Sequence, residues 1–310
     1  MVNVTSIQSK EVEIKKIVLR ETIHNYFSLL KPRVMSLSIF TSIVGMIIAP
    51  GSLSLLTSFL VILAITIGSG ASGALNMWYE RETDALMART KDRVLPSKRI
   101  SPIGALIFGS VLALFSIILL YYASNSLAAA LLALTIFYYI FVYTIWLKKK
   151  TPQNIVIGGA AGAFPPLIGW ASVTGSLTVE ILLLFLLIFL WTPPHFWALA
   201  LYQSDDYKKA GIPMMPVVVG DRKTVSMIIF YSLTLLPVTM MMSYYYSIFF
   251  AISSAILGIG FIYLAINLRT YLGEGKMFVK KAQTLFYFSI IYLFNIFAIL
   301  LIDNLMWNIV

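Results

Sequence analysis

Residues 54–99 read SLLTSFLVILAITIGSGASGALNMWYERETDALMARTKDRVLPSKR. The first part of this stretch, residues 54–75, carries no charge and is long enough to cross a bilayer, which takes about 20 mostly apolar residues. The second part begins at Asn76 and is dense in acidic and basic residues. The stretch therefore predicts a transmembrane helix that ends in a polar segment at the membrane boundary.

The rest of the chain has the same apolar character. Only 12% of the 310 residues are charged, and the mean hydropathy is +0.88. Nearly every apolar run is apolar on all faces, which favours lipid-embedded helices over helices of a soluble core. We therefore expect an all-α polytopic membrane protein with about nine transmembrane helices. The candidate spans are residues 34–50, 54–75, 103–122, 126–146, 154–173, 180–201, 225–243, 246–267 and 283–302.

The basic residues are confined to one set of loops. All 23 Lys and Arg lie in the N-terminal tail or in loops 76–102, 148–151, 202–224 and 268–282, and the intervening loops contain none. Because cytoplasmic loops are enriched in Lys and Arg, the N-terminus should be cytoplasmic and the C-terminus outside. The net charge of +10 thus reflects topology and an anionic ligand or lipid, and nucleic acid is not expected as a partner.

The chain contains no cysteine. Disulfides, thiolate nucleophiles and cysteine metal clusters are therefore excluded. The tail has Glu11, Glu13 and Glu21 and no apolar h-region, so it resembles neither a secretory signal nor a transit peptide. We expect a cytoplasmic tail over 1–30, a membrane-embedded domain over 31–310, and a plasma-membrane location.

Three oxygen-bearing side chains, Asn76, Glu80 and Asp84, follow one another at four-residue steps. On a helix such steps drift by only about 40°, so the three share one face. The residues could simply form a solvated helix end. However, like charges at i and i+4 destabilise a helix unless a cation intervenes, and Mg²⁺ is often held by one or two carboxylates together with substrate phosphates. With Arg89 and Arg93 just beyond, the pattern favours a magnesium and diphosphate site.

A second loop repeats the composition of the first. Asp205 and Asp206 precede Lys208 and Lys209, four helices after the first acidic loop. The segment could be an ordinary turn. If the two loops belong to similar halves of the molecule, they should converge, and Asp205 and Asp206 would supply further metal ligands.

Other cations flank the spans. Lys31 and Arg33 lie at the entry of the first span, and Lys148 lies at the exit of the fourth, about one turn after Tyr143. These charges could serve only to orient the chain against lipid headgroups. Because a diphosphate needs several cations, we expect some of them to face the substrate.

Proline pairs interrupt two spans. Trp191 to Trp197 reads WTPPHFW and includes His195, the one histidine predicted within a span. An ionisable group at membrane depth suggests function, although a hydrogen-bonded structural histidine is an equal alternative. The run NIVIGGAAGAFPPLIGW, residues 154–170, is rich in small residues and predicts close helix packing.

These motifs resemble the UbiA superfamily of intramembrane prenyltransferases, and more closely its haem-farnesylating branch. The first acidic motif with Arg89-Thr90 and Arg93 fits the superfamily. Departures are Glu80 where aspartate is frequent, Val94 where proline is expected, and Tyr202 in place of the first acid of the second motif. The stretches that resemble the haem branch are residues 143–170, 191–201 and 206–220.

The resemblance implies nine helices around a central cavity. It also implies transfer of the farnesyl group of farnesyl diphosphate to a vinyl group of haem b, giving haem O, with Mg²⁺ as cofactor. Asn76, Glu80, Asp84, Arg89 and Arg93 would be catalytic. The metal ligands would be Glu80, Asp84, Asp205 and Asp206; substrate-binding residues would be Lys31, Arg33, Tyr143, Lys148, His195, Lys208 and Lys209. A downstream haem-modifying enzyme would be a partner in the bilayer.

Three other functions are compatible with parts of the pattern. A UbiA-type enzyme could act on an aromatic or quinone-precursor acceptor instead of haem. A transporter usually has ionisable groups near the bilayer midplane, whereas here the acids cluster in loops at one face. A haem-binding assembly factor would not need the magnesium motif.

Overall fold

The computed structural model describes residues 18–307, and every regular element in that range is a helix. Of the tail expected over 1–30, residues 1–17 lie outside the described range and residues 18–29 are helical. Eight helices of the described part are long and apolar enough to cross a membrane, and α2 (Pro32–Ile47) is a shorter apolar helix. The all-helical, multi-span prediction is confirmed, with the first of the nine expected spans the shortest.

The helices follow the expected spans with small shifts in their ends. After α2 the elements are α3 (Leu55–Asp84), α4 (Pro102–Ala123), α5 (Ser126–Phe137), the π-helix η1 (Tyr138–Leu147), α6 (Asn154–Gly158), α7 (Ala160–Thr174), α8 (Val179–Tyr202), α9 (Ser204–Lys209), α10 (Met215–Met242), α11 (Ile248–Thr270) and α12 (Lys276–Trp307).

Polar side chains in the short turns start several of these helices. The side-chain oxygens of Ser54, Ser101 and Asn125 each accept a hydrogen bond from the backbone N–H three residues later, at the first turn of α3, α4 and α5. The first N–H groups of a helix lack partners within it, so these caps stabilise the helix ends.

Helix α10 departs from the sequence prediction. It begins at Met215, whereas the span was expected to begin at residue 225. Gly220, with φ 77° and ψ 167°, breaks the helix near its start. A positive φ is readily available to glycine, so the apolar turn before Gly220 and the long helix after it can meet at an angle.

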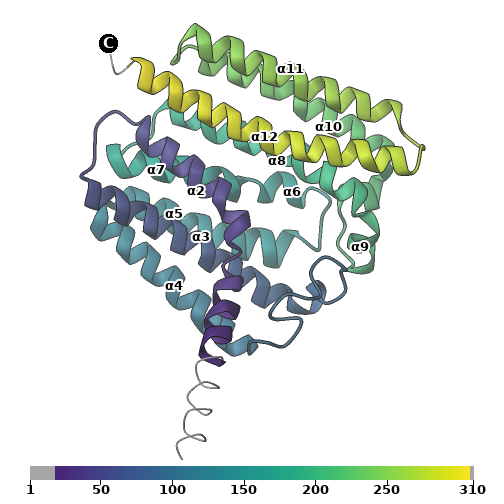
Figure 1. Ribbon diagram of the computed structural model, residues 1–310, viewed down its shortest axis with the longest axis horizontal. Coiled ribbons are helices and arrows are strands. Elements are labelled where there is room, and N and C mark those ends of the chain that lie inside the picture. Colours follow the sequence, from purple (N-terminus) through teal and green to yellow (C-terminus); the bar gives the residue numbers. More distant parts are fainter. Residues whose placement is uncertain (1–17, 308–310) are drawn as a thin grey trace, which may run out of the picture.

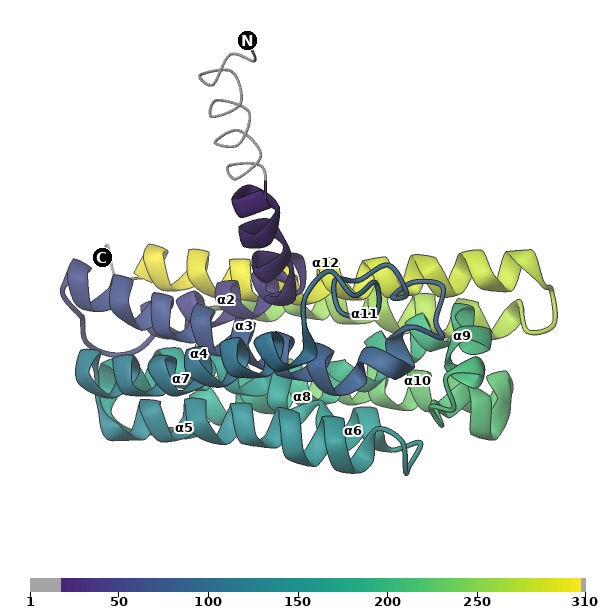
Figure 2. The ribbon, with the colours of Figure 1, turned by 90° about the horizontal axis from the view of Figure 1, so that it is seen from below.

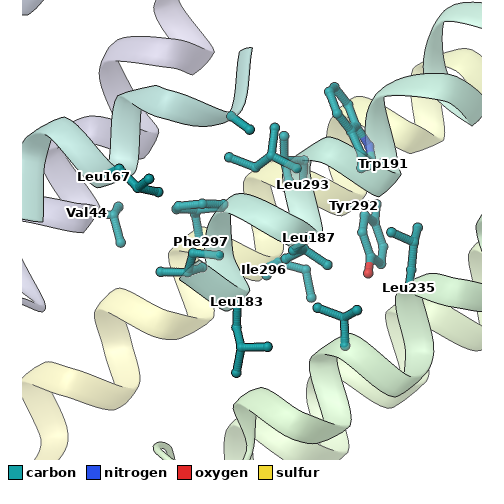
Figure 3. Packing of buried hydrophobic residues seen from close by; sticks show 14 of the residues in the cluster. Val44, Leu167, Leu183, Leu187, Trp191, Leu235, Tyr292, Leu293, Ile296 and Phe297 are labelled. Carbon is teal, nitrogen blue, oxygen red and sulfur yellow. The ribbon is translucent and has the colours of Figure 1, made fainter. Parts of the chain in front are cut away.

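The long helices lie side by side, and α8 lies at their centre (Figures 1 and 2). Leu183 and Leu187 of α8 belong to a buried cluster that also contains Val44 of α2, Leu235 of α10 and Phe297 of α12 (Figure 3). Because α12 packs against α8, α11 and α2, the C-terminal helix connects the early and the late helices.

Helices α2 and α7 approach each other closely through glycine. A Cβ atom on Gly169 of α7 would collide with the backbone oxygen of Ser42, and one on Gly45 of α2 would collide with the backbone of Pro166. The close packing expected of this small-residue run is confirmed. Both α7 and α8 continue through their internal proline pairs.

Replacing Gly169 with alanine should destabilise the fold, because neither backbone can yield to the added methyl group. Overpacking of this kind costs about 1–3 kcal/mol. Thermal unfolding in detergent should show a lower melting temperature for Gly169→Ala than for the parent. Gly162→Ala on the same helix is the matched control, because a Cβ atom there meets nothing within 4 Å. Equal melting temperatures for the two variants would contradict the prediction.

Candidate functional site

The three polar residues of the first motif lie at the end of α3 and are almost completely buried. Asn76, Glu80 and Asp84 have exposed fractions of 3%, 4% and 1%. Helix α3 continues to Asp84, nine residues beyond the expected end of the span at residue 75, so all three side chains are presented from one helix. Burying ionised carboxylates is costly unless each is paired.

Glu80 is paired with Lys148, which follows the π-helix η1. The two side chains form a salt bridge in which 15% of Lys148 and 5% of Glu80 is exposed. At the end of η1 the Lys148 N–H donates to the Tyr143 carbonyl, five residues back. The lysine Nζ also lies 5.7 Å from the centroid of the Tyr143 ring. In an α-helix residues five apart do not face each other, so the π-helix is what aligns Tyr143 with Lys148.

Asn76 is held in one orientation by two partners. Its Oδ1 accepts a hydrogen bond of 2.7 Å from Lys31 Nζ, and its Nδ2 donates to Thr144 Oγ1 at 3.1 Å. Thr144 in turn donates to the Tyr139 carbonyl at 2.8 Å, again five residues back in η1. The threonine's only proton is thus committed, and its oxygen can only accept from Asn76. This side chain was not singled out in the sequence, because its role depends on the π-helical register.

Asp84 is paired by the loop that follows it. Arg93 Nη1 lies 2.8 Å from Asp84 Oδ2, and Thr90 Oγ1 donates to the Asp84 carbonyl at 2.7 Å. Thr90 is completely buried. The loop therefore folds back over the end of α3 and brings an arginine to the second carboxylate.

The electrostatics of the two lysines differ. Burial alone would lower the pKa of Lys148, but the adjacent Glu80 carboxylate outweighs it and raises the pKa above its ordinary value. Burial lowers the pKa of Lys31 to about 7, with a further contribution from the positive charge of Arg93. Lys148 is therefore a permanent cation at neutral pH, whereas the charge of Lys31 depends on its surroundings.

The second acidic loop lies next to the first, as the similar compositions predicted. Met87 of the first loop shares a buried apolar cluster with Tyr207 of α9, Ile212 and Met214, and Tyr143 packs against it. The loop after α3 and helix α9 occupy the same end of the molecule (Figures 1 and 2).

The acids of that second loop are arranged differently from those of α3. Asp205 is exposed and Asp206 is half-buried. Within residues 18–307, no three His, Cys, Asp or Glu side chains form a cluster that could hold a metal ion. Glu80 and Asp84 thus stand as a buried pair, and metal ligation by Asp205 and Asp206 stays a prediction.

Four of the expected cations are exposed: Arg33, Arg89, Lys208 and Lys209. They contrast with the half-buried Lys31, Arg93 and Lys148, whose cationic groups each contact a polar side chain of α3. We call Lys31, Arg93 and Lys148 the inner cations, because each contacts a side chain of the first motif.

His195 lies in a separate aromatic environment. Its ring is stacked between Trp191 and Phe286, with ring centroids 4.3 and 4.7 Å apart, and its Nδ1 lies 2.6 Å from Ser289 Oγ. Trp191 Nε1 donates to the Ser289 carbonyl at 2.8 Å. The described contacts are those of a structural histidine linking α8 to α12, and a haem contact stays a prediction.

Two cavities lie away from the acid pair. One of about 410 Å³ lies between Tyr26 and α4, and one of about 300 Å³ is lined by residues that include Glu180 and Asp303. Neither is lined by Asn76, Glu80 or Asp84. The charges of the buried carboxylates Glu80 and Asp84 are paired with Lys148 and Arg93. This arrangement suits an anionic ligand that replaces the carboxylates as the partner of these cations.

The sequence profile of the UbiA prenyltransferase family matches residues 38–291. The chain belongs to this family. The matched range begins in α2 and ends in α12, so the UbiA region includes the acidic end of α3 and the second loop.

Two relatives are about 50% identical to this chain over most of its length. A protein named protoheme IX farnesyltransferase from Parvibaculum lavamentivorans is 52% identical over 285 residues, which cover 91% of this chain and 89% of the relative. Another of that name from Bartonella bacilliformis is 50% identical over 289 residues, or 93% of each chain.

Two solved structures share the UbiA fold. A digeranylgeranylglyceryl phosphate synthase superposes with a TM-score of 0.75 at 19% identity, covering 92% of this chain and 99% of that one. A UbiA homolog from Archaeoglobus fulgidus bound to DMAPP and Mg²⁺ gives a TM-score of 0.66 at 16% identity, covering 88% and 99%.

The Glu80–Lys148 pair predicts a measurable non-additivity. Lys148→Met should destabilise the protein by about 3–5 kcal/mol, because it leaves the Glu80 charge buried and unpaired. The double variant Lys148→Met/Glu80→Gln should regain most of that stability, since no unpaired charge remains, but should stay inactive in prenyl transfer. Thermal unfolding and turnover of the two single variants and the double variant give both quantities. Recovery of activity with stability would show that the pair is only structural.

Proposed function

We propose that this enzyme transfers the farnesyl group of farnesyl diphosphate to a vinyl group of haem b. The C1–O bond of farnesyl diphosphate breaks, and its electron pair leaves with diphosphate. Farnesyl C1 bonds to the outer vinyl carbon, and water adds to the inner carbon with loss of a proton. The products are haem O and diphosphate. Sequence identity of 50–52% over about nine-tenths of both chains to proteins named protoheme IX farnesyltransferase carries the proposal.

The inner cations are proposed to bind the diphosphate. Lys148 and Arg93 each contact a carboxylate, and Lys31 contacts the Asn76 amide. An arriving diphosphate offers these cations a more highly charged partner. As the C1–O bond breaks, negative charge grows on the leaving group, and fixed cations in a dry site stabilise that charge more than they stabilise the bound substrate.

Glu80 and Asp84 are the residues proposed to hold Mg²⁺, with Asp205 and Asp206 as candidate further ligands. Two buried carboxylates one turn apart offer oxygen donors only, which fits an ion that takes one or two protein carboxylates together with substrate phosphates. When bound, Mg²⁺ supplies positive charge to the diphosphate oxygens. Asn76, fixed by Lys31 and Thr144, keeps its carbonyl oxygen beside this site.

The remaining predicted site residues are proposed to interact with the two substrates. Tyr143, aligned with Lys148, would present its ring face to the farnesyl cation. His195 would contact haem. The exposed cations Arg33, Arg89, Lys208 and Lys209 would attract the anionic substrates to this end of the molecule. Because the farnesyl chain makes haem O strongly hydrophobic, a downstream haem-modifying enzyme would receive it within the bilayer.

The decisive experiment incubates the purified protein with haem b, farnesyl diphosphate and Mg²⁺. Mass spectrometry should detect haem bearing one farnesyl group and one added water. The product should vanish with EDTA and fall by at least about 100-fold in Asp84→Asn, because removal of one charge-stabilising group typically costs 10²–10³ in rate. Asp92→Asn, an exposed acid of the same loop, is the matched control and should retain activity.

The alternative is a UbiA-type enzyme that prenylates an aromatic or quinone-precursor acceptor. Diphosphate release with a phenolic acid but not with haem b would favour that reading and reject the haem acceptor. An activity that persists in both EDTA and Asp84→Asn would reject the proposed metal site.

We also propose that the protein lies in the plasma membrane with its N-terminus cytoplasmic and its C-terminus outside. The loops rich in Lys and Arg support this orientation. In bacterial cells, alkaline phosphatase fused after Val310 should be active, and the same enzyme inserted after Glu274 should be inactive. The opposite pattern would invert the topology.

A further inference from the structure

The helix at residues 18–29 is amphipathic, and part of its apolar face is uncovered. Leu19, Ile23 and Phe27 follow at four-residue steps and therefore lie along one side. Their exposed fractions are 61%, 60% and 55%. We call these three side chains the outer strip. If this helix were surrounded by water, these three apolar side chains would be in contact with water.

The neighbouring edge of the same apolar face packs on the protein. The Tyr26 ring meets Phe108 of α4 edge-on at a centroid distance of 5.0 Å, and Leu29 is completely buried. The polar residue Glu21 lies about 160° around the helix from Ile23 and is exposed. The helix is thus attached by one edge, with the outer strip beside the attachment and a polar face beyond it.

The direction of this helix differs from that of the long helices. In Figure 2 this helix projects from the bundle and is steeply inclined to the long helices, which run side by side. A helix that lies across membrane-spanning helices runs along the membrane surface. Its attachment to the first turns of α4, which begins at Pro102, places it at the end of the molecule that holds the two acidic loops.

The helix is attached to α4 beside apolar side chains that face lipid. Ile103 and Ile107 of α4, one of the membrane spans, are 71% and 57% exposed. Between Tyr26 and α4 lies an open groove of about 410 Å³, lined mostly by apolar side chains that include Ile107 and Phe108. The groove lies between Tyr26, on the attached edge of the helix, and the lipid-facing side of α4.

We propose that helix 18–29 lies in the boundary between headgroups and hydrocarbon of the bilayer, with the outer strip in the hydrocarbon and a lipid chain in the groove. Amphipathic helices that lie in this boundary bury their apolar face about 5–10 Å into it. A second copy of the chain is the weaker occupant. A stable dimer buries about 800 Å² on each partner, and a strip of three side chains supplies much less.

The absence of cysteine from the chain makes a direct test available. Single cysteines at Ile23 and Glu21, on nearly opposite sides of the helix, are spin-labelled in the full-length protein reconstituted in phosphatidylcholine vesicles. Collision rates with oxygen, which partitions into lipid, and with a water-soluble nickel chelate are then compared. Ile107→Cys is the lipid-facing reference, and Glu274→Cys, exposed in the α11–α12 turn, is the aqueous reference.

The oxygen-to-nickel ratio at Ile23 should approach that at Ile107 and exceed that at Glu21 by several-fold, with Glu21 close to Glu274. Equal ratios at Ile23 and Glu21 would place the helix in water and overturn the proposal. Protection of Ile23 from both reagents would mean that protein covers the strip, which overturns it in favour of a second copy. All four positions are exposed, so the labels do not disturb packing.

Discussion

Charge compensation at the buried end of α3 is the constraint on which the surrounding structure depends. Two carboxylates that are 4% and 1% exposed are tolerated only with cations at hand. One cation arrives because η1 adopts π-helical register and turns Lys148 toward Glu80; the other arrives because the following loop folds back and delivers Arg93 to Asp84. The π-helix needs a specific explanation, since π-helical geometry is rare and is frequently found at functional sites. The π-helix and the returning loop are both explained by the acids that they neutralise.

The pairing of the two buried acids with cations has a consequence for how metal and diphosphate would bind in the proposed reaction. Metal alone would take Glu80 and Asp84 and leave Lys148 and Arg93 without partners, whereas diphosphate alone would take the cations and leave the acids unpaired. Each event by itself leaves buried charge uncompensated, which is costly. Metal and diphosphate together restore every pairing. In the proposed function, this makes the metal–diphosphate complex the ligand to which the protein is complementary.

Sequence alone predicted much of this and missed the rest for identifiable reasons. The apolar runs and the one-sided distribution of Lys and Arg predicted the helices, because bilayer length and hydrophobicity leave few alternatives. The four-residue spacing placed Asn76, Glu80 and Asp84 on one face, and α3 carries all three. Thr144 was missed because α-helical periodicity does not describe a π-helix. The early start of α10 was missed because Gly220 separates a short apolar turn from the rest of the helix, so that turn was assigned to the loop. The pairing of Arg93 with Asp84 depends on loop folding that no periodicity encodes.

Lys31 joins helix 18–29 to α2 and holds an uncommon backbone conformation, with φ 53° and ψ 54°. Non-glycine residues in that region cost about 1–3 kcal/mol, and glycine or asparagine adopts it more readily. The same residue provides the amine that contacts Asn76. If Lys31 binds diphosphate as proposed, selection for thermal stability and selection for turnover oppose each other at position 31. A laboratory evolution experiment that rewards heat resistance alone would drift toward glycine there and discard the amine. A lineage that kept lysine at position 31 would retain the amine that contacts Asn76 and would accept the strained backbone.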